Sequence, residues 1–173
     1  MPEGPEIHRA ADEIADVLVG HPAQTVRFGL AELQQYEQTL QGRQVRRVEA
    51  RGKAILTRFE GGWNIYSHNQ LYGKWMTRKA GEVPDTNRQL RVEITNDYQS
   101  AYLFSASEIA VLRDDELADQ SYLAKLGPDP LIRETDESDV VDRFEDTSFH
   151  RRQLATLLLD QGFVAGVGNY LRS

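Results

Sequence analysis

Two residues at the start of the chain could together do covalent chemistry without a metal. Pro2 follows Met1, and a methionine before a small residue is normally removed after synthesis, which would expose a secondary amine. An α-amino group titrates near pH ~8, and the positive end of a helix starting at Pro5 disfavours its ammonium form. A usable fraction of the Pro2 amine would then be nucleophilic, and the neighbouring Glu3 could move protons. The plainer alternative is that Pro2 has no role and that Glu3 only caps the helix.

A third candidate, Lys53, follows Gly52 where an apolar run begins. The run Ala54-Ile55-Leu56 indicates a buried strand, and a glycine lets backbone or a ligand approach closely. A lysine at such a strand start is consistent with an acid/base or phosphate-contact role, and equally with ordinary surface placement.

Two further segments have an unusual composition for loops. The segment His68-Asn69-Gln70-Leu71-Tyr72-Gly73 mixes amide, aliphatic and aromatic side chains where a turn should be simply polar. Such a loop either packs back on the core or forms a wedge that fills the gap left by an extruded nucleotide. The segment Gly166-Val167-Gly168-Asn169 offers backbone N–H groups and an amide at a helix start, as a phosphate clamp does. The dinucleotide-binding, P-loop and nucleophile-elbow motifs are absent from the sequence.

Composition excludes several other kinds of site. The 173 residues contain no cysteine, which excludes disulfides, cysteine nucleophiles, thiolate zinc sites and iron–sulfur clusters. The four histidines have no ligand-like spacing, so we expect no metal. No apolar run approaches the ~18 residues that span a bilayer, and the N-terminus is acidic, unlike a signal peptide. We therefore expect a cytoplasmic protein without a membrane partner.

The charge is unevenly distributed along the chain. Residues 1–107 carry 13 acidic and 13 basic side chains, so the whole net charge of −7 lies in residues 108–173. Within the neutral part, residues 43–79 hold nine Lys and Arg against two Glu, a local charge of +7. This segment is either a pair of strands with solvated basic faces or an electrostatic footprint for a polyanion.

The pattern of apolar residues predicts an α+β fold with two parts. An amphipathic helix runs from Pro5 to about Gly20, and short strands with turn residues between them follow from 24 to 105, as in a β-sandwich. The clearest hairpins are Leu90–Thr95 with Tyr98–Ser105, and Ile55–Phe59 with Trp63–Ser67.

After Ser105 the strand signals stop, and short helical turns are predicted at Ser107–Leu112 and Asp114–Ala118. The prolines of Leu126–Leu131 predict a boundary between a domain at 1–126 and a second at 127–173. Helices are expected at Asp136–Phe144 and Arg152–Leu159, and another begins at Tyr170.

Four motifs in this order resemble the formamidopyrimidine-DNA glycosylase/endonuclease VIII family of base-excision repair enzymes. They are Pro2-Glu3-Gly4-Pro5-Glu6, Arg51-Gly52-Lys53, Ser67-His68-Asn69-Gln70-Leu71-Tyr72-Gly73, and Leu157-Leu158-Leu159-Asp160-Gln161 with Gly166-Val167-Gly168-Asn169-Tyr170-Leu171. The first motif and the Gln-Leu-Tyr triplet resemble the endonuclease VIII branch, which favours oxidised pyrimidines. The resemblance implies a two-layer β-sandwich with an N-terminal helix, followed by a helix–two-turn–helix module, with DNA bound between them.

The resemblance also implies roles for individual residues. Pro2 would be the Schiff-base nucleophile, Glu3 the general acid/base, and Lys53 a phosphate contact needed for strand cleavage. The residues Gln70, Leu71 and Tyr72 would fill the void in the duplex, and Asn169 would hold a phosphate beside the lesion. Lys125 stands where the family often has a DNA-contacting arginine, which keeps the charge but loses the bidentate fork.

The family continues into a C-terminal zinc finger or a zincless equivalent, and these residues contain neither. From the resemblance we expect an N-terminal fragment of a monomeric DNA glycosylase and AP lyase, with no cofactor in this chain and duplex DNA with oxidised bases or abasic sites as its partner. Because the C-terminal part is missing, we expect the activity of the fragment itself to be negligible. Competing functions are a non-catalytic damaged-DNA-binding module and, less favoured, a small-molecule enzyme that uses an N-terminal proline as its base.

Overall fold

A computed structural model describes the whole chain, residues 1–173, and opens with helix α1 (Gly4–Leu18). The Glu6 carboxylate accepts a hydrogen bond of 2.6 Å from the backbone N–H of Glu3, which fixes the start of this helix. Its apolar stripe, which includes Ile7, Ile14 and Leu18, is buried. The predicted N-terminal helix is therefore confirmed, and no helix in the structure is both long enough and apolar enough to span a bilayer.

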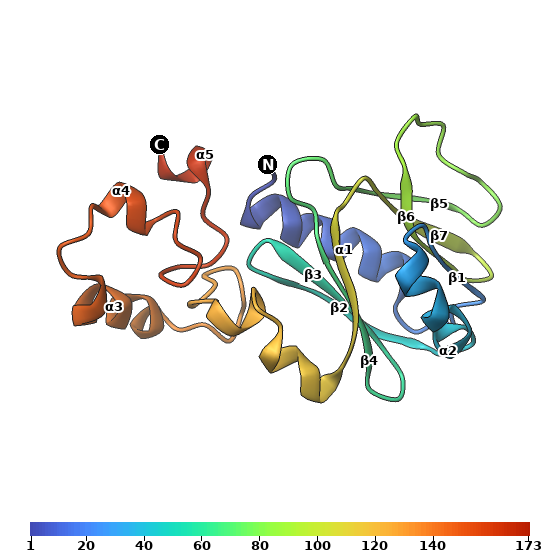
Figure 1. Cartoon of the computed structure of the whole chain (residues 1–173), viewed down its shortest axis with the longest axis horizontal. Helices are drawn as coiled ribbons and strands as arrows, with labels where there is room; N and C mark the ends of the chain where they lie inside the picture. Colours follow the sequence, from blue (N-terminus) through green and yellow to red (C-terminus); the bar gives the residue numbers. More distant parts are fainter.

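Two four-stranded antiparallel sheets form the sandwich (Figure 1). One sheet has the order β1 (Thr25–Phe28), β6 (Leu90–Thr95), β7 (Gln99–Phe104) and β5 (Lys74–Lys79). The other has the order β2 (Val45–Arg51), β3 (Ala54–Phe59), β4 (Trp63–His68) and β8 (Glu108–Arg113). Between β1 and β2 the chain forms η1 (Ala31–Tyr36) and α2 (Glu37–Leu40). The two predicted hairpins are the β6–β7 and β3–β4 pairs.

The main core contains residues from both sheets and from α1. Ile14 of α1, Ile55 of β3 and Ile94 of β6 belong to one cluster of 22 buried residues. Burial of this apolar area stabilises the sandwich and fixes the position of α1. The loops at the ends of the strands therefore extend from a well-packed sandwich.

The predicted helical turn at Ser107–Leu112 is wrong, because this stretch forms β8 along β4. Val111 and Ile109 pack with the main core, whereas Ala110 and Leu112 pack against a second small cluster on the outer face of the sheet. A strand covered on both faces loses the alternation of polar and apolar residues by which strands are recognised. The turn predicted at Asp114–Ala118 is confirmed as η2 (Asp114–Asp119).

The rest of the chain consists of short helices beside the sandwich (Figure 1). They are η3 (Leu123–Lys125), α3 (Glu137–Glu145), η4 (Thr147–Phe149), α4 (Leu154–Leu157) and α5 (Asn169–Arg172). The helix predicted at Arg152–Leu159 is thus shorter than expected, whereas those at Asp136–Phe144 and Tyr170 are confirmed. Figure 1 shows α5 lying close to the N-terminus, where the two parts of the molecule meet.

Candidate active site

The carboxylate of Glu3 is held by backbone groups from the far end of the sequence. Its oxygens accept hydrogen bonds from the N–H groups of Tyr170 at 2.6 Å, Leu171 at 3.0 Å and Gly168 at 3.2 Å. Burial raises the pKa of Glu3, but these three donors and the positive charge of Lys53 together lower it below its usual value. Glu3 is therefore a carboxylate at neutral pH, although only 6% of the residue is exposed.

Glycines allow this close approach between the two ends. A Cβ atom at Gly168 would lie 2.5 Å from the carboxyl carbon of Glu3, so no side chain fits there without a shift. The backbone N–H of Gly4 donates to the carbonyl of Gly166 at 2.8 Å, and Gly166 has a φ of +89°. The glycine segment was predicted to offer its N–H groups to a phosphate, but the N–H of Gly168 serves Glu3 instead. The side chain of Asn169, the next residue, is exposed.

Lys53 lies in the tight turn between β2 and β3, next to Gly52 with a φ of +60°. The N–H of Gly52 donates to Asp129 Oδ2 at 3.0 Å, and the N–H of Lys53 donates to the Tyr122 hydroxyl at 2.8 Å. Burial lowers the pKa of Lys53, and the negative charge of Glu3 partly offsets that effect. The structure therefore brings Glu3 and Lys53 close enough for each charge to act on the other.

Asp129 ties three parts of the site together. Besides Gly52, its carboxylate contacts His8 Nε2 at 3.1 Å and accepts from the N–H of Leu131 at 2.9 Å. Burial raises the pKa of Asp129, but these partners outweigh burial and lower it. The residue thereby fixes α1, the Lys53 turn and the segment after the predicted boundary to one another.

Pro2 lies half-buried directly before Glu3 and α1. The preceding Met1 is 62% exposed, so it is accessible for removal. The α-amine of Pro2 exists only after Met1 has left.

The loop between β4 and β5 exposes two of its three candidate residues. Leu71 is 62% and Tyr72 is 72% exposed, so these side chains do not pack back on the core. Gln70 is held instead, because its amide nitrogen donates to Glu108 Oε2 at 3.1 Å and its amide oxygen accepts from the Ser107 hydroxyl. Gln70 also has a φ of +51°, a left-handed conformation that is uncommon for a residue with a side chain. We call residues 69–73 the wedge loop.

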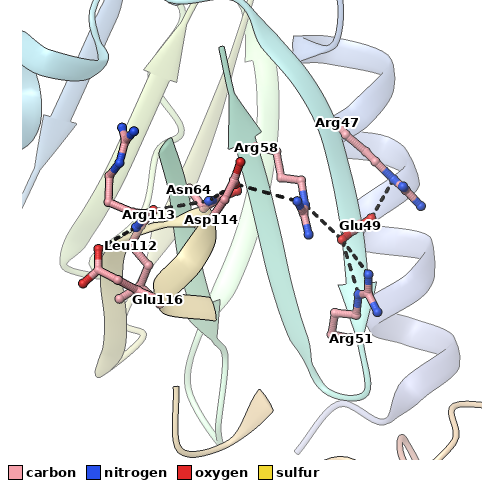
Figure 2. A network of polar contacts seen from close by, with 9 residues as sticks. All are labelled: Arg47, Glu49, Arg51, Arg58, Asn64, Leu112, Arg113, Asp114 and Glu116. Atoms are coloured by element: carbon pink, nitrogen blue, oxygen red, sulfur yellow. Dashed lines mark hydrogen bonds and ion pairs between the residues drawn. The ribbon is translucent and has the colours of Figure 1, made fainter. Parts of the chain in front are cut away.

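The basic strands are partly neutralised within the sheet (Figure 2). Glu49 is 8% exposed and meets Arg47 Nε at 2.6 Å, Arg51 Nη2 at 3.1 Å and Arg58 Nε at 3.1 Å. These three arginines and one glutamate leave a net charge of +2 on this part of the outer face. This part of the face is therefore positively charged, but Glu49 reduces the charge of its three arginines from +3 to +2.

Lys125 lies exposed at the end of η3, and its side chain forms no hydrogen bond or ion pair within the structure. No group of three or more His, Asp or Glu side chains is arranged to hold a metal ion.

None of the candidate functional motifs in the sequence includes Tyr122, Asp129 or His8. Asp129 stands between Pro128 and Pro130, in the stretch that indicated a domain boundary, and this is the only local signal it has. The contacts of Tyr122 and Asp129 span 69 and 77 positions, beyond the reach of any local pattern.

Comparisons with known proteins agree with this arrangement. Residues 1–105 match the family described as the formamidopyrimidine-DNA glycosylase N-terminal domain. The chain is 46% identical over 172 residues to Endonuclease 8 of Salmonella schwarzengrund and 47% identical over 172 residues to that of Pectobacterium atrosepticum. Both matches cover 99% of the chain, which spans only 65% of the length of these relatives.

Solved structures share the fold. The Fpg of Lactococcus lactis in complex with DNA containing an abasic site superposes with a TM-score of 0.78 at 19% identity. That match covers 98% of this chain and 64% of the other. The same protein in complex with an oxidised pyrimidine containing DNA gives a TM-score of 0.78 at 19% identity, covering 98% and 65%.

Proposed function

The chain belongs to the formamidopyrimidine-DNA glycosylase family, and we propose from this that it carries the catalytic part of a base-excision repair DNA glycosylase with AP-lyase activity. Its substrate is duplex DNA with oxidised pyrimidines or abasic sites. The observation that carries the proposal is the ionised Glu3 carboxylate, buried beside the Pro2 position and coupled in charge to Lys53.

The first step forms a bond from the Pro2 nitrogen to C1′ of the damaged nucleotide. The bond from C1′ to the base breaks, and the base leaves with the bonding electron pair and takes up a proton. The amine proton passes to Glu3, whose lowered pKa keeps it ready as a base, and Glu3 then gives a proton to the ring oxygen as the sugar opens. The product is an iminium ion between Pro2 and C1′.

The iminium ion acts as an electron sink in the second step. It acidifies C2′, and loss of a proton there allows the C3′ oxygen to leave with its phosphate, which breaks the strand. Lys53 contacts that phosphate, and its partial burial strengthens the charge interaction. Leaving Pro2 free again requires hydrolysis of the iminium ion by water.

The remaining candidate residues hold the DNA. Leu71 and Tyr72 are exposed as a wedge requires, and with Gln70 they fill the space of the extruded nucleotide. From the resemblance to the family, Asn169 and Lys125 bind phosphates, and both residues are exposed as such contacts require. The protein acts as a monomer in the cytoplasm.

The second candidate function is a module that binds damaged DNA without turnover. The exposed wedge loop would serve binding even in a chain that keeps Met1 and so lacks the Pro2 amine. The basic residues around Glu49 would assist either function.

Borohydride trapping distinguishes the two functions, because borohydride reduces the iminium ion to a stable covalent adduct. In a version of the chain continued to the length of its relatives, we expect an adduct with a thymine-glycol duplex from protein that lacks Met1. The Pro2→Gly variant tested in parallel should give a lower yield, because its N-terminal glycine still offers a primary amine. Binding without an adduct from protein whose Met1 removal is verified by mass would favour the non-catalytic module.

A further inference from the structure

A chain of side-chain contacts joins the wedge loop to the Lys53 turn. It runs from Gln70 through His68 and Tyr122 to the backbone of Lys53. His68 is a buried residue of β4, and Tyr122 packs against the small cluster on the outer face of the sheet, outside the cluster of 22 buried residues.

At one end of this chain, Tyr122 fixes the backbone of the lysine turn. Its hydroxyl accepts from the N–H of Lys53 at 2.8 Å, and a Cβ atom at Gly52 would lie 2.7 Å from the same oxygen. The Tyr122 hydroxyl therefore lies so close to the turn that only glycine fits at position 52 without a shift. Burial raises the pKa of Tyr122 to about 12, so the hydroxyl is neutral at physiological pH.

At the other end, His68 holds the wedge loop. Its Nδ1 accepts from the N–H of Gln70 at 3.1 Å, which requires that this nitrogen carry no proton. Burial lowers the pKa of His68, in agreement with a neutral ring. The ring meets that of Tyr122 edge to face, with centroids 4.9 Å apart and an interplanar angle of 80°.

The wedge loop is also held in a conformation that must change on DNA. The Gln70 amide is bonded to Glu108 and Ser107, and a side chain so bonded cannot enter a duplex. The backbone of Gln70 has a left-handed φ of +51°, a strained conformation, and it carries the N–H that His68 accepts. Release of the side chain from its two partners removes the contacts that hold this conformation. Packed aromatic rings transmit a shift of this backbone because they leave no free volume between them.

We propose that Tyr122 is a positioning residue that couples the wedge loop to Lys53 through His68. Filling of the void by Gln70 then sets the backbone of Lys53 in place for its phosphate, so strand cleavage follows lesion recognition. This proposal rests on the proposed function, whereas the coupling between the two loops can be measured without any catalysis.

Amide hydrogen exchange at Lys53 and Gln70 tests the coupling in the chain as it stands. The Tyr122→Phe variant keeps the ring but loses the hydroxyl, so the Lys53 amide should exchange roughly tenfold faster while the Gln70 amide is unchanged. The Tyr122→Leu variant loses the ring as well, so the amides of both Lys53 and Gln70 should exchange faster. The matched control Tyr98→Phe changes a tyrosine that is 68% exposed and should alter neither.

Single-turnover kinetics test the consequence for the reaction, in a version of the chain continued to the length of its relatives. The Tyr122→Phe variant should slow elimination from an abasic duplex roughly tenfold, with the yield of borohydride adduct unchanged. Combining Tyr122→Leu with Gln70→Ala should cost less than the sum of the two single losses, because part of the effect of Gln70 acts through Tyr122.

Two results would overturn the coupling. One is unchanged Gln70 exchange in Tyr122→Leu; the other is uniformly faster exchange across the sandwich, which would make Tyr122 a packing residue only. An absence of adduct from the lengthened chain without substitutions and without Met1 would instead count against the proposed function, and the exchange result would still stand.

Discussion

The β-sandwich and the residues after Leu126 hold their shapes by different means. The sandwich and α1 share a cluster of 22 buried residues, whereas the later helices have a cluster of three, Leu157, Phe163 and Val164. The later part is fixed to the sandwich instead by polar contacts, above all those made by Glu3 and Asp129. The comparison shows that Glu3 and Asp129, which join the two parts, also belong to the candidate site: Glu3 is its carboxylate, and Asp129 holds the turn that carries Lys53.

The largest effect should come from removing the charge that joins the two parts. Glu3→Gln keeps the size of the side chain but removes the proton acceptor, so base release should fall by roughly 10²–10⁴-fold. Excision from a thymine-glycol duplex measures the loss in a version of the chain continued to the length of its relatives, and duplex binding should persist. The control Glu13→Gln alters an exposed residue of the same helix. Excision by Glu3→Gln at the unaltered rate would refute the role given to Glu3.

The second largest effect should follow from a side chain at position 168, where the later residues contact Glu3. In Gly168→Val the new side chain occupies the place of the Glu3 carboxylate, which then loses its backbone donors. We expect the yield of borohydride adduct to fall by roughly 10²-fold, with the sandwich still folded by circular dichroism. If Gly168 acts through Glu3, the double variant Gly168→Val/Glu3→Gln should give the same yield of adduct as Glu3→Gln alone. Additive losses would separate the two residues.

Changes on the wedge loop should affect only substrates with a void to fill. Leu71→Ala with Tyr72→Ala should reduce excision from duplex DNA by roughly 5–100-fold, since stacking contributes ~1–3 kcal/mol per base. Excision from single strands should change little, and so should stability, because both side chains are exposed. The control Val83→Ala truncates another exposed apolar residue. Equal losses on both kinds of DNA would show that the loop has a different role.

The smallest effect concerns stability against acid. The pKa of Asp129 is lowered in the folded state, so its ionised form stabilises the protein fully above its unfolded pKa of ~3.9. This stabilisation is lost as the pH falls through the folded pKa. Asp129→Asn should therefore lower the free energy of unfolding by about 1–3 kcal/mol at neutral pH and flatten the fall in Tm below pH ~4. Asp115→Asn, an exposed change, is the control, and an unchanged acid limb in Asp129→Asn would contradict the assignment.

The sequence predicted the parts of the site that are local. Pro2, Glu3 and the helix behind them are adjacent in the chain, and the wedge loop is one continuous turn, so each could be singled out as a candidate from neighbouring residues. The resemblance to the glycosylase family then favoured their functional roles over the plainer alternatives. The fold class and two hairpins were likewise predictable from neighbouring residues. β8 was not, because η2 and η3 cover its second face and remove the alternation expected of a strand.

The contacts that tune the site were beyond local reasoning. The glycine at 168 suggested an exposed turn, but its neighbour in space is Glu3, 165 positions earlier. His8 and Asp129, 121 positions apart, gave no signal as a pair either. Such partners are set by how the two parts dock, and docking depends on the complete shape of both.

The contact between Glu3 and the far end of the chain also sets an order of events during synthesis. Leu171 is made 168 residues after Glu3, and at a synthesis rate of ~5–20 residues per second this interval is on the order of ten seconds. The sandwich residues leave the ribosome first and can fold around α1 while Glu3 has none of its backbone donors. A nascent chain can therefore have a folded sandwich before its site is complete. The Glu3 carboxylate gains its three backbone hydrogen bonds only after Gly168, Tyr170 and Leu171 have been made.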